Sequence, residues 1–238
     1  KKLDKEFICD IFKVITKRKC NSGGYRDDNM PKQLKTLTSF YKEHYSKTII
    51  KDEWLTIELP KINLEVKKQA GKVVLFKLTG EDYPTEEQVN QTVFPDSGKI
   101  LLPLKVLLKH QALLKNRIKN QDIGFWFATH EEIEDSLLLL GDINQFPLIA
   151  VNIEKFSDGR IFSRGKQIRI KYGFNKTLRA FGDVLRDQLF FLKRSGFNSY
   201  LIRKDRDAVD ALKSLNDFSN PYQGALDTID PVWKRIKR

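Results

Sequence analysis

The hydrophobic positions between residues 147 and 223 change repeatedly between a strand-like and a helix-like pattern. Short runs of consecutive apolar residues, rich in β-branched and aromatic side chains, are typical of strands that are buried on both faces. Each run is followed by a stretch in which apolar residues recur at helical spacing. The pattern predicts strands over residues 148–153, 177–181 and 198–202, and helices over residues 160–171, 183–195 and 206–218.

A fourth strand–helix unit lies immediately upstream, with a strand over residues 123–128 and a helix over residues 131–140. Connections that contain a helix join parallel strands through right-handed crossovers. We therefore predict an α/β fold of about four βα units with a parallel sheet, arranged either as half of a (β/α)₈ barrel or as a doubly wound sheet. The pattern leaves both arrangements open.

The first eighty residues predict a small α+β region. Apolar residues recur at helical spacing over residues 3–19 and over residues 31–45, which indicates two amphipathic helices. From Trp54 the period changes to two, which is typical of antiparallel strands. The alternating segments are residues 54–59, 62–66 and 73–78.

Composition divides the chain into four parts. Prolines and a glycine precede a further predicted helix over residues 103–116, and they indicate a linker. We expect an added N-terminal region over residues 1–80, a linker over residues 81–99, a βα domain over residues 100–223 and a basic C-terminal tail over residues 224–238.

Polar residues gather where the predicted strands end. Asp158, Arg160 and Ser163 follow one strand, and Arg179 and Asp183 lie in or just after the next. In both candidate architectures ligands bind at the carboxyl ends of the strands, so these residues could share one rim. The alternative interpretation is structural: the two aspartates cap helices, as Asp183 would at the helix that follows it, and the arginines pair with them.

The same residues carry a resemblance to a known family. Three ordered motifs contribute, Phe156-x-Asp-Gly-Arg-x-Phe-Ser, Leu178-Arg-Ala-x-Gly-Asp-Val-Leu-x-Asp-Gln-Leu-Phe and Arg194-x-Gly-Phe. With the segments at Ile100 and Leu148, residues 95–223 resemble the bacterial family catalogued as domain of unknown function 934. The resemblance implies an association with sulfite reduction, and it nominates as polar positions Asp158, Arg160, Ser163, Arg179, Asp183, Asp187 and Gln188.

The charge of the chain is concentrated at its two ends. The formal net charge is +12, from 43 Lys and Arg against 31 Asp and Glu. A basic surface of this kind either serves solubility alone or attracts the phosphates of a nucleic acid or anionic lipid. Trp233 lies among four basic residues, which is typical of an anchor for RNA or a protein groove, unless the tail folds back on its own body. The candidate contacts to RNA or a partner are Lys13, Lys17, Arg18, Lys19, Trp233, Lys234, Arg235, Lys237 and Arg238.

Several classes of chemistry find no support in the sequence. Cys9 and Cys20 match no zinc motif and are too few for a four-cysteine iron–sulfur cluster, so we predict no metal and no cofactor. The three histidines are scattered and no nucleophile motif is present, so we name no catalytic residue. No apolar run approaches the roughly 18 residues of a transmembrane helix. The chain starts at Lys1, which indicates a removed leader or a trimmed start.

Two classes of function follow. The first is a non-catalytic subunit of a large assembly that contacts RNA and neighbouring proteins, either in a ribonucleoprotein like an organellar ribosome or, less directly, in a respiratory complex. The mitochondrial matrix would then be the expected location, with the bacterial cytoplasm as the alternative. The second, implied by the resemblance, is an accessory protein or oxidoreductase of sulfite reduction that binds a small oxyanion through arginines at the rim.

Overall fold

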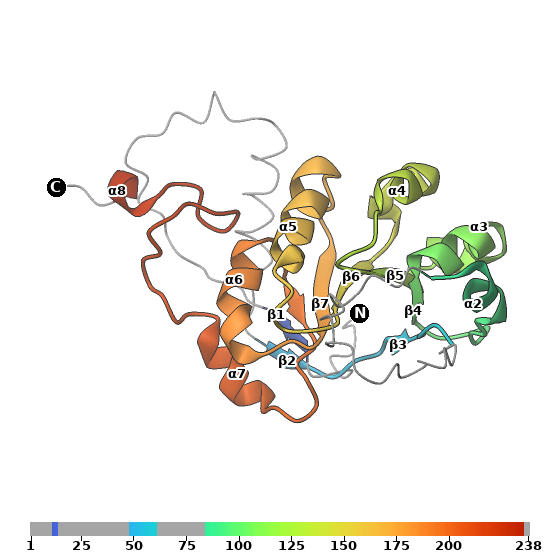
Figure 1. The fold of residues 1–238 in the computed structure, drawn as a ribbon, viewed down its shortest axis with the longest axis horizontal. Helices are drawn as coiled ribbons and strands as arrows, with labels where there is room; N and C mark the ends of the chain where they lie inside the picture. The colour runs from blue at the N-terminus through green and yellow to red at the C-terminus, as the bar shows by residue number, and fades with distance from the viewer. Residues whose placement is uncertain (1–10, 14–47, 61–83, 236–238) are drawn as a thin grey trace, which may run out of the picture.

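The computed structural model describes residues 11–13, 48–60 and 84–235 (Figure 1). Within them, six parallel strands form one sheet in the order in which they occur in the chain. A doubly wound sheet reverses its strand order at one point, and this sheet does not, so it is a half-barrel. The strands are β3 (Leu55–Thr56), β4 (Ile100–Pro103), β5 (Ile123–Ala128), β6 (Leu148–Ile153), β7 (Thr177–Gly182) and β8 (Ser199–Tyr200).

Helices join successive strands and cover the outer face of the sheet (Figure 1). Right-handed crossovers between strands in consecutive order place every connecting helix on the same face. A π-helical turn (Gln167–Lys171) continues α5, and a 3₁₀ turn, η4 (Arg186–Gln188), precedes α6. The α-helices are α2 (Glu86–Gln91), α3 (Leu104–Lys119), α4 (Glu134–Leu140), α5 (Arg160–Lys166), α6 (Leu189–Arg194), α7 (Ala208–Ser214) and α8 (Val232–Arg235).

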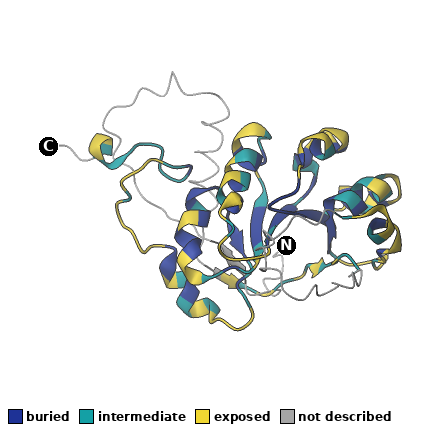
Figure 2. Cartoon of the chain, viewed as in Figure 1, coloured by how far each residue is buried: buried dark blue, intermediate teal, exposed yellow. Residues whose placement is uncertain are grey.

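The central strands β4, β5 and β6 are buried on both faces, as their continuous apolar runs predict (Figure 2). In β5, Phe125 and Phe127 pack into the main core beneath the helices. Trp126 points to the opposite, inner face, where it packs with Leu101 and Ala150 in a second cluster. The sheet is therefore the central layer of the fold, with apolar contacts on both sides.

Residues 48–60 form a strap along the inner face. Its first strand, β2 (Thr48–Ile50), pairs with β1 (Ile11–Lys13), which lies beside β8, and the strap ends at β3 on the edge of β4. Between these points the Asp52 carboxylate accepts two hydrogen bonds of 2.9 Å from the guanidinium of Arg179 in β7. The carbonyl of Ile57 accepts a further bond from the indole of Trp126.

Several predictions for the N-terminal part are corrected. The segment around Leu55 is parallel to β4 and belongs to the main sheet, so the predicted antiparallel strand is wrong here. A sequence period of two indicates which face of a strand is buried, but it does not indicate the direction of the strand. Residues 11–13 form a strand rather than part of a helix, since they pair with residues 48–50. The remaining predicted elements, residues 31–45, 62–66 and 73–78, lie outside the described residues.

Two further elements went unrecognised in the sequence. Residues 100–103 form β4, which the proline at its end obscured, and the expected linker contains α2. Thr85 caps α2 in a capping box, in which its hydroxyl accepts from the Gln88 amide and its own amide donates to the Gln88 side chain. The start of the expected tail also packs on the body, with Leu226 buried and Asp227 bound to Arg194.

We predict that the ion pair between Asp52 and Arg179 holds the strap on the sheet. The substitution Asp52→Ala leaves a buried guanidinium without its carboxylate and should lower the free energy of unfolding by about 3–5 kcal/mol. Urea unfolding measures the loss. The neighbouring surface pair of Glu53 and Lys99 supplies the control, since Glu53→Ala should cost less than about 1 kcal/mol. Equal losses for the two substitutions would contradict the prediction.

Candidate functional site

The candidate site lies at the carboxyl ends of β5 to β8. Thr129 follows β5, Asp158 follows β6, Asp183 follows β7 and Arg203 follows β8. The ends of parallel strands meet at one edge, which is where half-barrels and barrels bind their ligands. We call this set of side chains the carboxyl edge.

Asp158 accepts more hydrogen bonds than the other carboxylate of the carboxyl edge, Asp183. Its two oxygens accept hydrogen bonds of 2.9 Å from Nε and Nη2 of Arg160, and one also accepts from the Arg160 amide. The hydroxyl of Thr129 donates to the same carboxylate from the end of β5. Burial by itself would raise the pKa of Asp158, but the hydrogen bonds from Arg160 and Thr129 outweigh it and lower the pKa below its ordinary value.

Asp183 ties three loops together and does not cap a helix, so that prediction is wrong. Gly182 turns the chain with a φ of 97°, and the helical turns begin only at Arg186. The Asp183 carboxylate instead accepts from the Phe156 amide at 3.0 Å and from Nη1 of Arg203 at 2.9 Å. Its position therefore joins the loops that follow β6, β7 and β8.

Arg203 shares its guanidinium between two carboxylates. It binds Asp205 with hydrogen bonds of 2.6 and 2.8 Å in addition to Asp183. The hydrogen bonds that Arg203 donates to Asp205 and to Asp183 raise the pKa of Arg203, and the contact with Arg203 lowers the pKa of Asp205. Gln188 completes the arrangement, because its side-chain amide donates to the Phe156 carbonyl at 2.6 Å.

A second group of polar side chains closes the end of β5. The Arg164 guanidinium donates to the carbonyls of Thr129 and Glu131, at 3.0 and 2.7 Å. The Glu131 carboxylate accepts from the Ala128 amide at 2.7 Å, and burial raises the pKa of this carboxyl. His130 is buried beside it, with Nδ1 4.0 Å from a Glu154 oxygen.

The other predicted rim residues lie apart from the carboxyl edge. The Arg179 side chain points to the inner face of the sheet and binds Asp52, as described above. Ser163 is exposed in α5, and Asp187 is exposed in η4. Of the seven nominated residues, the structure brings together Asp158, Arg160, Asp183 and Gln188 around the loop at Phe156.

Sequence reasoning missed Thr129, Arg164 and Arg203. Thr129 directly follows a correctly predicted strand, so the rule that sites form at carboxyl ends would have found it. Arg203 follows β8 in the same way. Arg164 binds two backbone carbonyls and the side chain of Gln167, and contacts with backbone carbonyls cannot be recognised in a sequence.

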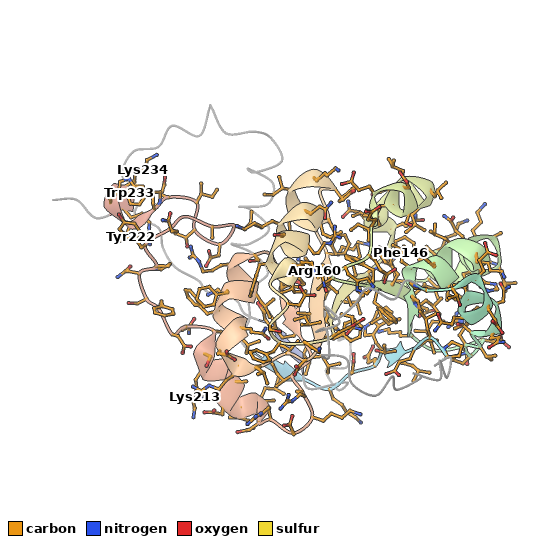
Figure 3. The ribbon with its side chains drawn as sticks, in the orientation of Figure 1. Phe146, Arg160, Lys213, Tyr222, Trp233 and Lys234 are labelled. Carbon is orange, nitrogen blue, oxygen red and sulfur yellow. The ribbon has the colours of Figure 1, made fainter. Side chains whose placement is uncertain are left out.

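The basic end of the described chain carries a pair of exposed aromatic rings. Trp233 in α8 lies 5.2 Å from Tyr222, measured between ring centroids, with 50° between the ring planes. The two residues are 56% and 65% exposed. Figure 3 shows them with Lys234 at the periphery of the molecule, away from the sheet. The Arg235 guanidinium donates to the Pro221 carbonyl and the Val232 amide to the Tyr222 carbonyl, so α8 is fixed to the preceding loop.

Of the other basic residues predicted to contact RNA or a partner, most lie outside the described residues. Lys13 lies in β1. Lys17, Arg18, Lys19, Lys237 and Arg238 lie outside the described residues. Among the residues that are described, no group of three or more His, Cys, Asp or Glu side chains could hold a metal ion. Every helix in that part of the chain is too short or too polar to cross a bilayer.

Comparison with known proteins identifies one family. Residues 124–233 match the sequence model of a family described as bacterial protein of unknown function (DUF934). The resemblance inferred from the three motifs is thereby confirmed, although the match begins and ends later than residues 95–223. It includes the carboxyl edge and Trp233 and excludes the strap with Asp52. No curated protein shows significant similarity to the chain.

We predict that Asp158 makes the carboxyl edge sensitive to acid. Its pKa is lowered in the folded protein, so it contributes stability above its ordinary pKa of about 3.9, and this contribution is lost as the pH falls through the lower folded pKa. At pH 7, Asp158→Asn should destabilise the protein by about 1–2 kcal/mol.

Urea unfolding of wild type and variant at a series of pH values measures this effect. The difference between them should shrink below about pH 4. Asp187→Asn, which changes an exposed carboxylate in η4, is the control and should have little effect at any pH. A difference that does not depend on pH would contradict the assignment.

Proposed function

From the exposed aromatic pair and the basic charge of the chain, we propose that this protein is a non-catalytic, RNA-associated subunit of a large assembly, built on an enzyme-like half-barrel. The observation that carries the proposal is the pair of Tyr222 and Trp233 beside Lys234, on a chain with a net charge of +12.

Exposed aromatic rings provide stacking surfaces for bases. Tyr222 and Trp233 each leave more than half of their surface in solvent, although burial of rings of this size is strongly favourable. Hydrogen bonds to the backbone of residues 221–222 hold α8 and therefore fix the ring positions before any partner arrives. Stacking of a base on such a ring contributes about 1–3 kcal/mol and requires no particular base sequence.

The charge of the chain complements a phosphate backbone. Lys234 and Arg235 occupy the last turn of α8, immediately after Trp233. Residues 1–70 hold 16 basic and 10 acidic side chains, so the opposite end of the chain carries a surplus of its own. Attraction of this kind supplies most of the sequence-independent affinity for nucleic acids and weakens as salt is added.

The carboxyl edge supports a non-catalytic role. Asp158 is bound by Arg160 of the same loop, and Asp183 is bound by Arg203 of the loop after β8. A catalytic carboxylate is usually held with its pKa near the working pH, whereas the pKa of Asp158 is lowered. The carboxylates of Asp158 and Asp183 are thus both held by contacts within the chain. The bacterial origin in the family description favours a bacterial ribonucleoprotein over an organellar one.

A second candidate is an accessory protein of sulfite reduction that binds a small oxyanion. It is favoured by Arg160, whose side chain is 47% exposed at the carboxyl edge. A guanidinium offers paired donors to an oxyanion, but here an anion would have to compete with Asp158. Arg160→Gln should abolish sulfite binding if this candidate is right and should leave RNA binding unchanged if the first one is.

We predict that Trp233 and Tyr222 contact RNA. Fluorescence anisotropy with a labelled single-stranded oligouridine measures the affinity, and added salt should weaken it. Trp233→Ala and Tyr222→Ala should each reduce the affinity by about fivefold to a hundredfold, which corresponds to the loss of about 1–3 kcal/mol of stacking.

Lys119→Gln provides the matched control, because Lys119 is an exposed cation at the end of α3, on the opposite side of the molecule from α8 (Figure 1). It removes one positive charge far from α8, and it should change the affinity by less than about twofold. The proposal fails if the wild-type protein shows no salt-dependent affinity, or if Trp233→Ala and Lys119→Gln behave alike.

A further inference from the structure

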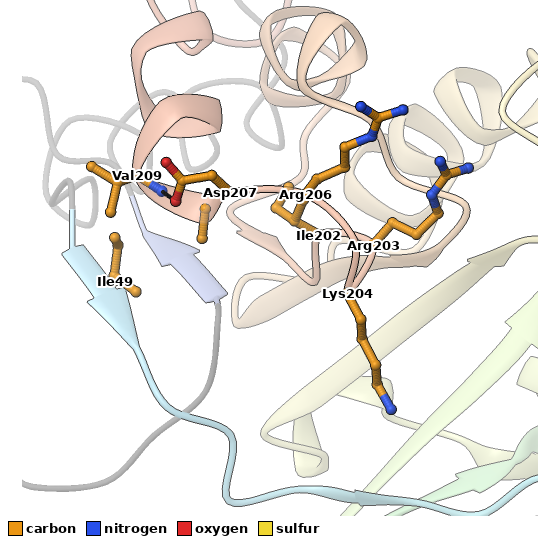
Figure 4. A pocket seen from close by; sticks show the side chains of 8 residues that line it. Ile49, Ile202, Arg203, Lys204, Arg206, Asp207 and Val209 are labelled. Atoms are coloured by element: carbon orange, nitrogen blue, oxygen red, sulfur yellow. Dashed lines mark hydrogen bonds between the residues drawn. The ribbon is translucent and has the colours of Figure 1, made fainter.

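A pocket of about 290 Å³ lies between β2 and the loop that joins β8 to α7 (Figure 4). Its volume is close to the lower limit of ordinary ligand sites and corresponds to the volume of about ten water molecules in the liquid. Ile49, from the strap, contributes to its wall. Because the strap lies outside the family match, this pocket depends on a part of the chain that the family does not define.

One side of the pocket is apolar. Ile49 and Val209 are both exposed, and Figure 4 shows their side chains facing each other across the gap between β2 and α7. Ile202 and Ala208 extend this apolar lining. Exposed aliphatic side chains that converge in a hollow offer a place for a hydrocarbon group.

The rest of the lining is charged, and two of its charged groups are already committed. The Asp207 carboxylate caps α7 by accepting from the amides of Val209 at 2.9 Å and Asp210 at 3.2 Å. The Arg203 guanidinium is occupied by Asp183 and Asp205. Neither group is therefore well placed to bind an additional charged molecule.

Lys204 and Arg206 supply the remaining charges, and both are positive and exposed. Figure 4 shows them leaving opposite sides of the loop, with Lys204 on the side away from Arg203. Arg206 lies 3.6 Å from Asp205, whose oxygens already hold Arg203 more closely. The mouth of the pocket thus combines long, mobile cationic side chains with an apolar wall.

We propose that this pocket binds an amphiphilic anion, that is, a phosphate or carboxylate group attached to a short hydrocarbon chain. The hydrocarbon packs on Ile49, Ile202 and Val209. The anion is bound on one side of the loop, by Lys204 or by Arg206. The proposal is independent of RNA binding by α8, which uses other residues at another place in the fold.

Isothermal titration calorimetry on the full chain tests the proposal, with n-hexyl phosphate, heptanoate, inorganic phosphate and 1-hexanol as probes. At least one of the two amphiphilic anions should bind at least about tenfold more tightly than inorganic phosphate, because each buried methylene strengthens binding about fourfold. It should also bind more tightly than 1-hexanol, which has no charge. Inorganic phosphate or 1-hexanol binding as tightly as both anions would overturn the proposal.

Variants locate the binding. The double substitution Lys204→Gln and Arg206→Gln should weaken binding of the amphiphilic anion by about tenfold, and Val209→Ser should weaken it by about threefold through lost apolar contact. All of these side chains are exposed, so the fold should persist, and urea unfolding checks this. Lys119→Gln and Leu138→Ser make the same kinds of change elsewhere on the surface and should have no effect. Wild-type affinity in the double variant, or equal losses in the controls, would contradict the assignment.

Discussion

The buried pair of Asp52 and Arg179 constrains the whole arrangement. Arg179 lies in the middle of β7, and its side chain is only 3% exposed, so its charge has no access to bulk water. Burying a charge is unfavourable by several kcal/mol unless a partner neutralises it. The partner comes from a segment 127 positions away in the chain, so the inner face of the sheet can form in this way only when the strap is in place.

The same pattern recurs at the carboxyl edge, where each arginine meets a carboxylate of the chain itself. Asp158 with Arg160 fixes the loop after β6, and Asp183 with Arg203 connects the loops after β7 and β8. Such pairs hold the loops in place. They also leave this edge with little unpaired charge that a ligand could bind. We therefore propose that an anionic partner is recognised outside this edge, by the basic residues and exposed rings around α8 and at the mouth of the pocket beside α7.

The sequence predicted the body of the fold well and the site only in part. Buried parallel strands such as β5 and β6 reveal themselves as apolar runs, because both of their faces require apolar side chains. Asp158 and Arg160 were found since they follow such a strand. Arg179 was misplaced because position in the sequence does not reveal that its side chain turns to the inner face and meets Asp52. Tyr222 was missed because its ring gains significance only from contact with Trp233.

The central claim is that the surface around α8 contacts RNA in the cell. Ultraviolet cross-linking of the native protein in living cells, followed by mass spectrometry of the RNA-bound peptides, tests it most directly. The account predicts a cross-linked peptide that contains Trp233 or Tyr222, because stacked aromatic rings are in direct contact with bases. Recovery of the protein free of RNA, or with cross-links confined to other parts of the chain, would contradict it.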